Sequence, residues 1–298
     1  MTKLTISNLN KTYPNGTKAL VDVNLSLDKG MFGLLGPNGA GKSSLMRTLA
    51  TLQEADSGTA FLGEIDMLKD PQAVRKTLGY LPQEFGVYPR ITALQLLDHV
   101  ATLKGITQRK ERKELVEYLL QKVNLYAERN KSVKGFSGGM KQRVGIAQAL
   151  IGEPQLIIVD EPTAGLDPGE RNRFHNLLAE VGEEVIVILS THIVDDVREL
   201  CTKMAIMNLG QIVYSGTPSN ALEALNEKVW RKTIERAEKE DYKGRYHVIS
   251  DKMVGGRPQI HVLSETDPGD GFQKVAPNLE DVFFTQVHSS TADSMSHV

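Results

Sequence analysis

One stretch of the chain combines glycines, a lysine and a serine at a spacing that binds phosphate. The pattern G-x-x-x-x-G-K-S lies between an apolar run that ends at Leu35 and a helix-like segment, which is typical of a phosphate-binding loop. The glycines let successive N–H groups point into one concavity, and the helix start adds its positive dipole end. Lys42 can reach the β- and γ-phosphates of a nucleotide, and the Ser43 hydroxyl can ligate Mg²⁺. The predicted nucleotide-binding residues of this stretch are Gly36, Pro37, Asn38, Gly39, Ala40, Gly41, Lys42, Ser43 and Ser44.

Further residues that could take part in catalysis lie directly after two apolar strands. The run 156–159 is wholly apolar and ends in Asp160 and Glu161, at the edge of an open α/β sheet where ligands bind. Asp160 can hold Mg²⁺ through water, and Glu161 can act as a general base toward an attacking water. His192 follows the strand 185–189 and can donate to a γ-phosphate oxygen, although a histidine there is by itself more typical of an ordinary loop.

Two weaker signals leave alternatives open. Tyr13 lies upstream of the glycine loop, where its ring can stack on a nucleotide base or simply pack in a loop. Ser137 precedes Gly138 and Gly139 at the start of a helix that runs toward Ile151. This start is either a second anion-binding helix N-terminus or merely a flexible cap.

The elements around these residues alternate between strand and helix. Strands are predicted over 4–9, 21–27, 58–62 and 78–81, and a helix over 71–76. Thr92 and Gln95 have the spacing of a capping box before a helix, and a second helix is predicted over 109–123. The sequence therefore predicts an α/β fold with an antiparallel N-terminal part and a helical insertion at about 84–151. His99 in this insertion is interpreted as packing or solvent-facing.

Composition bounds the class of protein. The 298 residues are 40% hydrophobic and 24% charged, and the formal charge is −2, which suits a globular protein without bulk affinity for nucleic acid. The single cysteine, Cys201, excludes an internal disulfide and favours a reducing compartment. Neither a signal-peptide core nor an apolar run of about 20 residues is present, so membrane association is expected through a partner.

Together these residues resemble the ATP-binding subunit of an ABC transporter, with a P-loop NTPase fold, over about residues 3–217. In chain order, the resemblance rests on Tyr13 as the adenine-stacking ring, 36–43 as Walker A, Gln83 as the Q-loop, Ser137–Gly139 as the signature, 156–160 with Glu161 as Walker B and catalytic glutamate, Gly165–Asp167 as the D-loop, and His192 as the H-loop histidine.

The resemblance implies ATP hydrolysis with Mg²⁺ in a head-to-tail dimer that holds two ATP. It implies catalytic roles for Glu161, His192 and Gln83, metal contacts from Ser43, Gln83 and Asp160, and nucleotide contacts from Ser137, Gly138, Gly139 and Asp167. Phe136 and Met140 depart from the usual Leu-Ser-Gly-Gly-Gln signature, which affects the tuning of the partner contact. Both a homodimer and a heterodimer with a sister ATPase satisfy this arrangement.

The resemblance also implies a separate integral membrane permease and a cytoplasmic position on the inner face of the membrane. The groove for that permease is expected after Gln83, with Phe85 and Tyr88 as candidate contacts or, alternatively, core residues. No nucleic-acid partner is expected. A non-transport ABC ATPase acting on ribosomes or DNA is the alternative, disfavoured by the single cassette and the short insertion. A module that binds ATP without turnover is disfavoured by Glu161 and His192.

The chain beyond residue 218 is predicted to be a small α+β accessory domain, 219–298, appended to a nucleotide-binding domain, 1–218. We expect a helix-like stretch that begins beyond Pro218 and runs through Trp230 to Lys239, strands over 247–249 and 259–263, and disorder after about His288. The stretch 277–284, Pro-Asn-Leu-Glu-Asp-Val-Phe-Phe, resembles ATPases of the ABC-2 type, which export drugs, lipids or polysaccharides.

Overall fold

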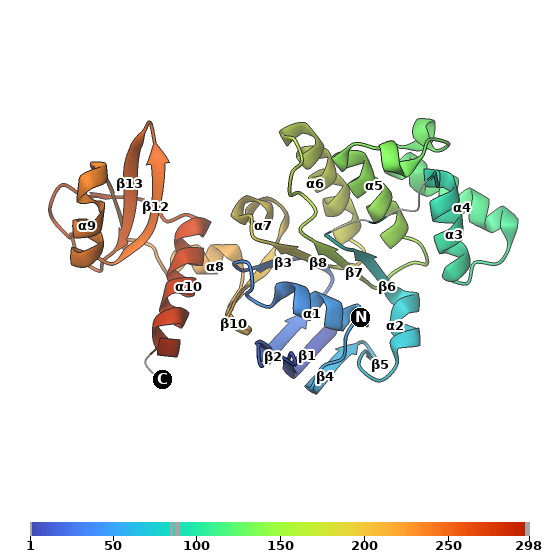
Figure 1. The fold of residues 1–298 in the computed structure, drawn as a ribbon, viewed down its shortest axis with the longest axis horizontal. Coiled ribbons are helices and arrows are strands. Elements are labelled where there is room, and N and C mark those ends of the chain that lie inside the picture. Colours follow the sequence, from blue (N-terminus) through green and yellow to red (C-terminus); the bar gives the residue numbers. More distant parts are fainter. Residues whose placement is uncertain (1, 84–85, 87–89, 296–298) are drawn as a thin grey trace.

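Three sheets organise the chain, two in the main body and one beside it (Figure 1). The structure is a computed structural model that describes residues 2–83, 86 and 90–295, with 290–295 described by backbone only. The predicted permease contacts Phe85 and Tyr88 lie outside the described residues.

The central sheet is parallel except at one edge. Its strand order is β10-β9-β3-β8-β7-β6, and only β10 runs antiparallel to its neighbour. Leu35 pairs with Thr191, and Asp160 pairs with Ser190, so the carboxyl ends of three strands lie side by side, as Mg-nucleotide sites on open sheets require. The strands are β3 (Gly30–Leu35), β6 (Leu78–Leu81), β7 (Leu156–Asp160), β8 (Ile186–Thr191), β9 (Lys203–Asn208) and β10 (Gln211–Gly216).

The second sheet is antiparallel and contains the N-terminal strands, as predicted. Its order is β2-β1-β4-β5, and it is built from β1 (Leu4–Thr12), β2 (Lys18–Leu27), β4 (Ser57–Leu62) and β5 (Ile65–Asp66). Alternating side chains of β1 are buried toward the body, as expected for a sheet with one covered face.

The parallel sheet is buried on both faces because its side chains alternate between two cores. Leu156 and Ile158 of β7 point into the core shared with the antiparallel sheet and α1 (Lys42–Leu49). Ile157 and Val159 point into the opposite core, which the helices of the other face cover. This explains why the strand reads as an uninterrupted apolar run.

The remaining helices of the body match the predicted pattern closely. The Thr92 capping box is confirmed: its side chain accepts from the Gln95 N–H and the Gln95 side chain accepts from the Thr92 N–H. These helices are α2 (Pro71–Thr77), α3 (Ala93–Leu103), α4 (Arg109–Lys122), α5 (Gly138–Ala149), α6 (Pro168–Gly182) and α7 (Val194–Leu200), with single 3₁₀ turns η1 (Tyr126–Glu128) and η2 (Val133–Gly135).

Helix α5 lies unusually close to strand β6. A Cβ at Gly79 would collide with the carbonyl oxygen of Ala149, and a Cβ at Gly145 would collide with Leu81. Since only glycine permits this approach, α5 is fixed to the central sheet, whereas α3 and α4 form the outer part of the predicted insertion.

The helix predicted from beyond Pro218 through Trp230 to Lys239 is only partly correct. Its beginning is helical, as α8 (Pro218–Glu223), but Trp230 lies in β11 (Val229–Thr233), which pairs with β13 (Arg257–Leu263). The charged residues after Trp230 have high helix propensity, but cross-strand pairing of Trp230 with Val262 overrides it. The other elements of this unit are β12 (Val248–Val254), β14 (Gln273–Lys274), η3 (Arg236–Glu238) and α9 (Lys239–Arg245).

The end of the chain also differs: up to Met295, helix replaces the disorder expected after His288, and the rest of that prediction, 296–298, lies outside the described residues. The last helix, α10, spans Leu279–Met295. Small polar residues at its end do not break a helix that has begun well, and the Val287 carbonyl accepts a hydrogen bond from Asn208 of β9 at 3.2 Å. The helix is thereby attached to the central sheet.

Helix α10 and the short helix α8 (Pro218–Glu223) connect the C-terminal sheet to the body (Figure 1). Leu279, Val282 and Phe283 of α10 belong to the same core as the central sheet, while Trp230 belongs to a separate core formed with α9. The domain division at 218/219 stays a prediction, since the segment after 218 contributes to both cores.

The stretch that resembled the exporter ATPases is a buried helix start. Asp281 is fully buried; its Oδ2 accepts from the Asn278 N–H at 3.0 Å, and its N–H donates to Asn278 Oδ1 at 3.1 Å. Its Oδ1 lies 2.7 Å from Nδ1 of the buried His261 on β13. Asp281 of the motif therefore fixes α10 onto the C-terminal sheet.

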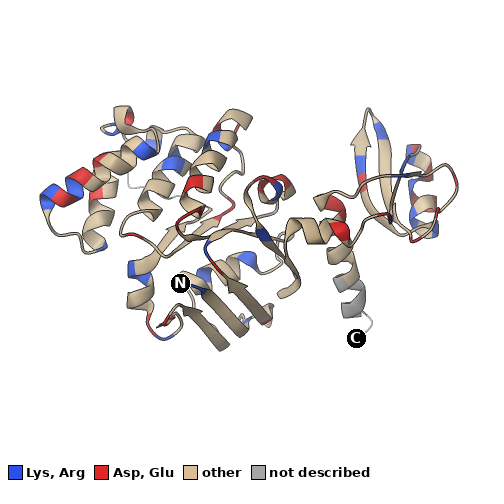
Figure 2. Ribbon diagram, turned by 180° about the vertical axis from the view of Figure 1, so that it is seen from behind, with Lys and Arg blue, Asp and Glu red and all other residues tan. Residues whose placement is uncertain are grey.

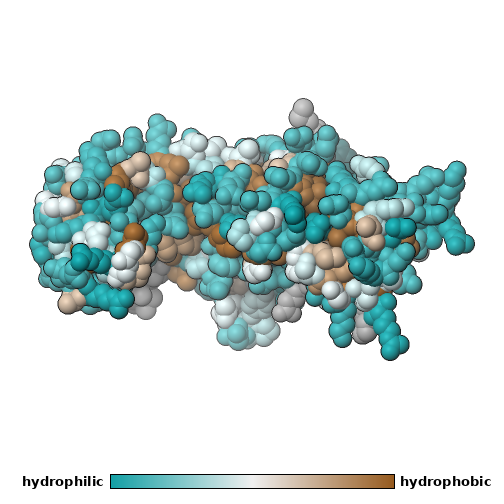
Figure 3. Space-filling view, turned by 90° about the horizontal axis from the view of Figure 1, so that it is seen from above, coloured by the Kyte–Doolittle hydropathy of each residue, from teal (hydrophilic) through white to brown (hydrophobic). Residues whose placement is uncertain are grey.

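The surface is mixed in charge and mostly hydrophilic. Lysine and arginine alternate with aspartate and glutamate along the helices (Figure 2), and on the face seen from above the apolar side chains form separate areas (Figure 3). In the described part of the chain, none of the helices has the length and apolar character needed to cross a bilayer.

Candidate nucleotide site

The glycine loop joins β3 to α1 and closes around the ammonium group of Lys42. Gly41 caps the helix in a left-handed conformation with φ 107°, and a Cβ at Gly36 would meet the Met207 carbonyl oxygen. Lys42 Nζ donates to the carbonyl oxygens of Gly36 at 2.7 Å and Pro37 at 3.1 Å. The predicted loop therefore forms, and the buried ammonium group of Lys42 is hydrogen-bonded to its backbone.

The charge of Lys42 is balanced by the acids at the end of β7. Burial lowers the pKa of Lys42, and the charges of Glu161 and Asp160 oppose this change. Lys42 Nζ lies 4.0 Å from Glu161 Oε1. Such a partly desolvated cation interacts strongly with phosphate because water screens it little.

Asp160 provides an oxygen that suits a divalent cation. The residue is buried, and its Oδ1 has no hydrogen-bond partner of standard geometry among the described residues. Burial raises the pKa of Asp160; the hydroxyls of Ser190 and Ser43 and the charge of Lys42 lower it, while Glu161 adds to the rise. Mg²⁺ prefers one or two carboxylates together with substrate phosphates, so an unpartnered carboxylate oxygen near Ser43 fits Mg²⁺. Among the described residues, no group of three or more His, Cys, Asp or Glu side chains could hold a metal ion by itself. Mg²⁺ would therefore need phosphate oxygens of the nucleotide as further ligands.

Glu161 brings the three predicted catalytic residues together. Its Oε1 lies 3.1 Å from His192 Nδ1, and its Oε2 accepts from Gln83 Nε2 at 3.1 Å. Its backbone has φ 47°, a left-handed conformation that is costly for a residue with a Cβ and that accumulates at functional sites. The Glu161 N–H donates to the Ser190 carbonyl at 2.8 Å, which holds this turn against β8.

Tyr13 lines the same pocket as the glycine loop, Gln83 and Glu161, with a volume of about 500 Å³. Its hydroxyl contacts Ser44 Oγ at 2.9 Å and donates to Gln53 Oε1 at 3.0 Å. Gln53 was not predicted: it follows α1 by four residues, and no local pattern marks it as a partner of Tyr13. The tyrosine ring is thus held at the wall of the pocket.

The signature residues lie elsewhere in the chain's own structure. Ser137 caps α5 and accepts from the Met140 N–H at 3.2 Å, and Asp167 caps α6 and accepts from the Glu170 N–H at 2.9 Å. Neither these residues nor Gly138 and Gly139 line the nucleotide pocket. The structure therefore does not bring these predicted contacts to the phosphate loop of the same chain.

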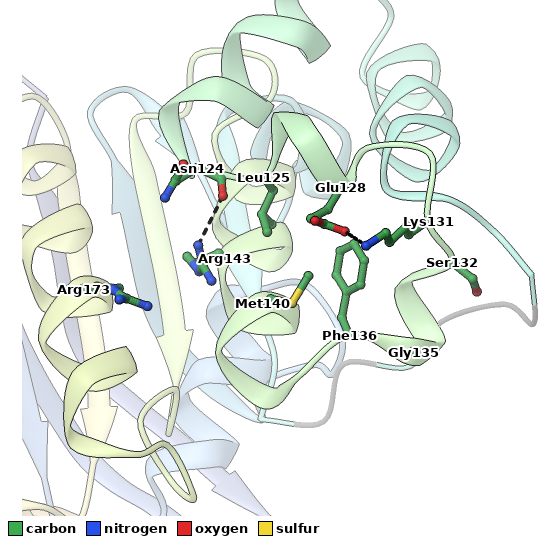
Figure 4. Close-up of a pocket in the computed structure, with 10 residues that line it drawn as sticks. All are labelled: Asn124, Leu125, Glu128, Lys131, Ser132, Gly135, Phe136, Met140, Arg143 and Arg173. Carbon is green, nitrogen blue, oxygen red and sulfur yellow. Dashed lines mark hydrogen bonds and ion pairs between the residues drawn. The ribbon is translucent and has the colours of Figure 1, made fainter.

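The two departures from the usual signature shape a second pocket of about 740 Å³ (Figure 4). Phe136 and Met140 form part of its apolar lining beside Leu125, and Arg143 extends across one side. Arg143 pairs with Glu170 at 3.2 Å. The substitutions thus change the wall next to the helix start, while Ser137 keeps its capping role.

The chain is similar to several known proteins. Residues 20–164 match the family model described as ABC transporter. The chain is 32% identical to the probable multidrug ABC transporter ATP-binding protein YbhF of Escherichia coli, over 94% of this chain and 51% of that protein, so it spans about half of that relative's length.

A second relative is covered more fully. The chain is 34% identical to the daunorubicin/doxorubicin resistance ATP-binding protein DrrA of Streptomyces peucetius, over 88% of this chain and 77% of that protein. Among solved structures, the dimeric, post-hydrolysis ATP-binding cassette MJ0796 bound to ADP and Pi is 26% identical, with a TM-score of 0.65, over 72% of this chain and 98% of that one.

Proposed function

The chain belongs to the family of the ATP-hydrolysing, ATP-binding subunits of ABC transporters, and we propose that it hydrolyses Mg-ATP and thereby drives a separate membrane permease. The observation that carries the proposal is the contact of Glu161 with both Gln83 and His192 beside the phosphate loop. A protein that binds nucleotide without hydrolysing it does not need a carboxylate held between two polar side chains in this way.

In the proposed mechanism, each residue has one task. The Lys42 ammonium binds the phosphates, and the Glu161 carboxylate accepts a proton from the attacking water. His192 holds Glu161 in place, and the Gln83 amide orients the opposite carboxylate oxygen. Mg²⁺, which Ser43 and Asp160 would hold with help from Gln83, supplies positive charge that neutralises the phosphate oxygens.

We further propose that two chains pair head to tail around two ATP. Support comes from the position of Ser137, Gly138, Gly139 and Asp167 outside the chain's own pocket, because these helix starts present free N–H groups that suit a phosphate held by another chain. The partner is a second copy or a sister ATPase. One solved cassette of similar fold is described as dimeric.

The direction of transport is proposed to be export. Support comes from two relatives whose names refer to multidrug transport and drug resistance, and from the motif at the start of α10. The chain would then act on the cytoplasmic face of the membrane, attached through its permease.

Two substitutions test the chemistry. Glu161→Gln should keep ATP affinity, lose turnover by at least about 100-fold, and accumulate an ATP-bound pair. Lys42→Ala should instead weaken ATP binding itself, since a charge-assisted phosphate contact is removed. Near-normal turnover of Glu161→Gln would overturn the assignment of the base. Co-purification from native membranes tests the permease: recovery of the chain without any integral membrane protein would contradict that part.

A further inference from the structure

A buried histidine on α6 lies between two carboxylates of α7. His175 is 5% exposed. Its Nε2 lies 3.0 Å from Asp196 Oδ1, and its Nδ1 lies 2.9 Å from Glu199 Oε2. Ionised carboxylates only accept hydrogen bonds, so both ring nitrogens must carry a proton for both contacts to be favourable. The geometry therefore requires a cationic imidazolium.

Asp196 is the centre of this cluster and is fully buried. Its Oδ1 also accepts from Arg171 Nε at 2.9 Å, and its Oδ2 accepts from the hydroxyls of Thr163 at 2.6 Å and Thr191 at 3.2 Å. Burial by itself would raise the pKa of Asp196, but hydrogen bonds from His175 and Thr163 and the charge of Arg171 hold it below its usual range.

The two threonines connect Asp196 to the catalytic residues. Thr163 follows Glu161 by two residues, and Thr191 directly precedes His192. Thr191 Oγ1 also accepts from the Ile193 N–H at 2.9 Å, so the chain is held on both sides of His192. One carboxylate thus sets the relative position of the two loops whose side chains meet at 3.1 Å.

The charges around His175 balance only when it is protonated. Arg171 and His175 on α6 face Asp196 and Glu199 on α7. The neighbouring Arg198 pairs with Asp195 at 3.0 Å and lies 3.9 Å from Glu199, so three carboxylates face two arginines and His175. A neutral ring would direct a nitrogen lone pair at one carboxylate and leave the cluster with excess negative charge. Glu199 is partly exposed and can turn away, whereas Asp196 cannot reach water.

We infer that His175, in its protonated form, is a positioning residue for Glu161 and His192 and acts on them through Asp196. The inference rests on the proposed ATPase function for its kinetic consequence only. Turnover should fall when the His175 ring is replaced, because Asp196 then loses a donor and its hold on the two loops weakens.

The kinetic test compares full-length variants. His175→Gln should lower kcat about 10-fold or more, the size typical of residues that orient a reacting group. ATP affinity should stay within about 2-fold, because none of the cluster residues lines the nucleotide pocket. His175→Arg keeps a positive charge and hydrogen-bond donors and should recover turnover. His99→Gln, an exposed histidine on α3, is the control and should match the wild type.

A second variant keeps the inference testable if His175→Arg fails to pack. Glu199→Gln keeps an acceptor for the His175 ring and leaves the contacts of Asp196 unchanged, so its kcat should stay within about 2-fold of the wild type. Equal kcat in wild type and His175→Gln, or a loss in Glu199→Gln as large as in His175→Gln, would overturn the inference.

A spectroscopic measurement tests the inference without turnover. In full-length protein with ¹⁵N-labelled histidine, the ring signals that disappear in His175→Gln should show both nitrogens protonated at neutral pH. The His192 ring signals should shift in His175→Gln and not in His99→Gln. A neutral His175 ring, or unmoved His192 signals, would refute the inference. If the wild type has no ATPase activity, the proposed function is refuted. The NMR measurement alone then tests the role of His175.

Discussion

Asp281→Ala should destabilise the C-terminal unit without affecting the nucleotide site. The fully buried carboxylate pairs with His261 at 2.7 Å and caps α10 through Asn278. Removing the carboxylate leaves the buried His261 ring and the Asn278 N–H without their partner, and each buried group left unsatisfied costs about 1–3 kcal/mol. The lost cap is part of that sum, since isolated caps contribute about 1 kcal/mol.

The neighbouring residue provides a matched control for this substitution. Glu280 pairs with Lys252 at 3.4 Å, and both side chains are about half exposed, so Glu280→Gln should cost less than about 1 kcal/mol. The protein contains one tryptophan, and Trp230 is buried in the core of the C-terminal sheet. Its fluorescence during denaturant unfolding therefore reports on this unit specifically.

The expected result is a shift of the Trp230 transition in Asp281→Ala alone, with ATP affinity unchanged in both variants. His261→Asn combined with Asp281→Ala should cost little more than Asp281→Ala, because the two residues act as a pair. Free energies of unfolding that differ by less than about 1 kcal/mol between Asp281→Ala and Glu280→Gln would refute the reasoning. Loss of ATP binding in Asp281→Ala with an unchanged Trp230 transition would also refute the reasoning.

Three further outcomes are expected. Tyr13→Ala should weaken ATP binding about 5- to 150-fold through lost stacking, whereas Tyr13→Phe should change it little; equal losses in a nucleotide titration would place the effect in the hydroxyl contacts with Ser44 and Gln53. Burial raises the pKa of Asp160, so its charge destabilises the nucleotide-free protein once the pH exceeds that pKa. Asp160→Asn should therefore raise the melting temperature near neutral pH while abolishing Mg²⁺-dependent turnover, and an unchanged or lower melting temperature would contradict this. Burial also raises the pKa of the Cys201 thiol, so a maleimide should label the unfolded chain at least about 100-fold faster than the native one, and rapid native labelling would contradict the burial.

The sequence was most informative where function depends on local spacing. The glycine loop, the acids after β7 and the Thr92 capping box each consist of neighbouring residues, so their geometry follows from a single turn or helix start. The meeting of Gln83, Glu161 and His192 could also be expected, since all three follow strands of one sheet.

Contacts between distant elements could not be predicted in this way. Trp230 was assigned to a helix because the charged residues after it favour one, and only pairing with β13 makes it a strand. Gln53 and His175 carry no local pattern that indicates their partners. Disorder was expected after His288 from composition, but attachment of α10 to Asn208 lies outside any sequence window.

The close approach of α5 to β6 has a consequence for how the chain can move. At Gly79 the backbone of β6 lies against the carbonyl oxygen of Ala149, and at Gly145 the backbone of α5 lies against the Leu81 side chain. Contacts this close leave little room for α5 to slide along the sheet. Ser137 at one end of α5 and the phosphate loop therefore belong to one rigid part. If two chains pair around nucleotide as proposed, opening and closing would then be a change in the angle between them.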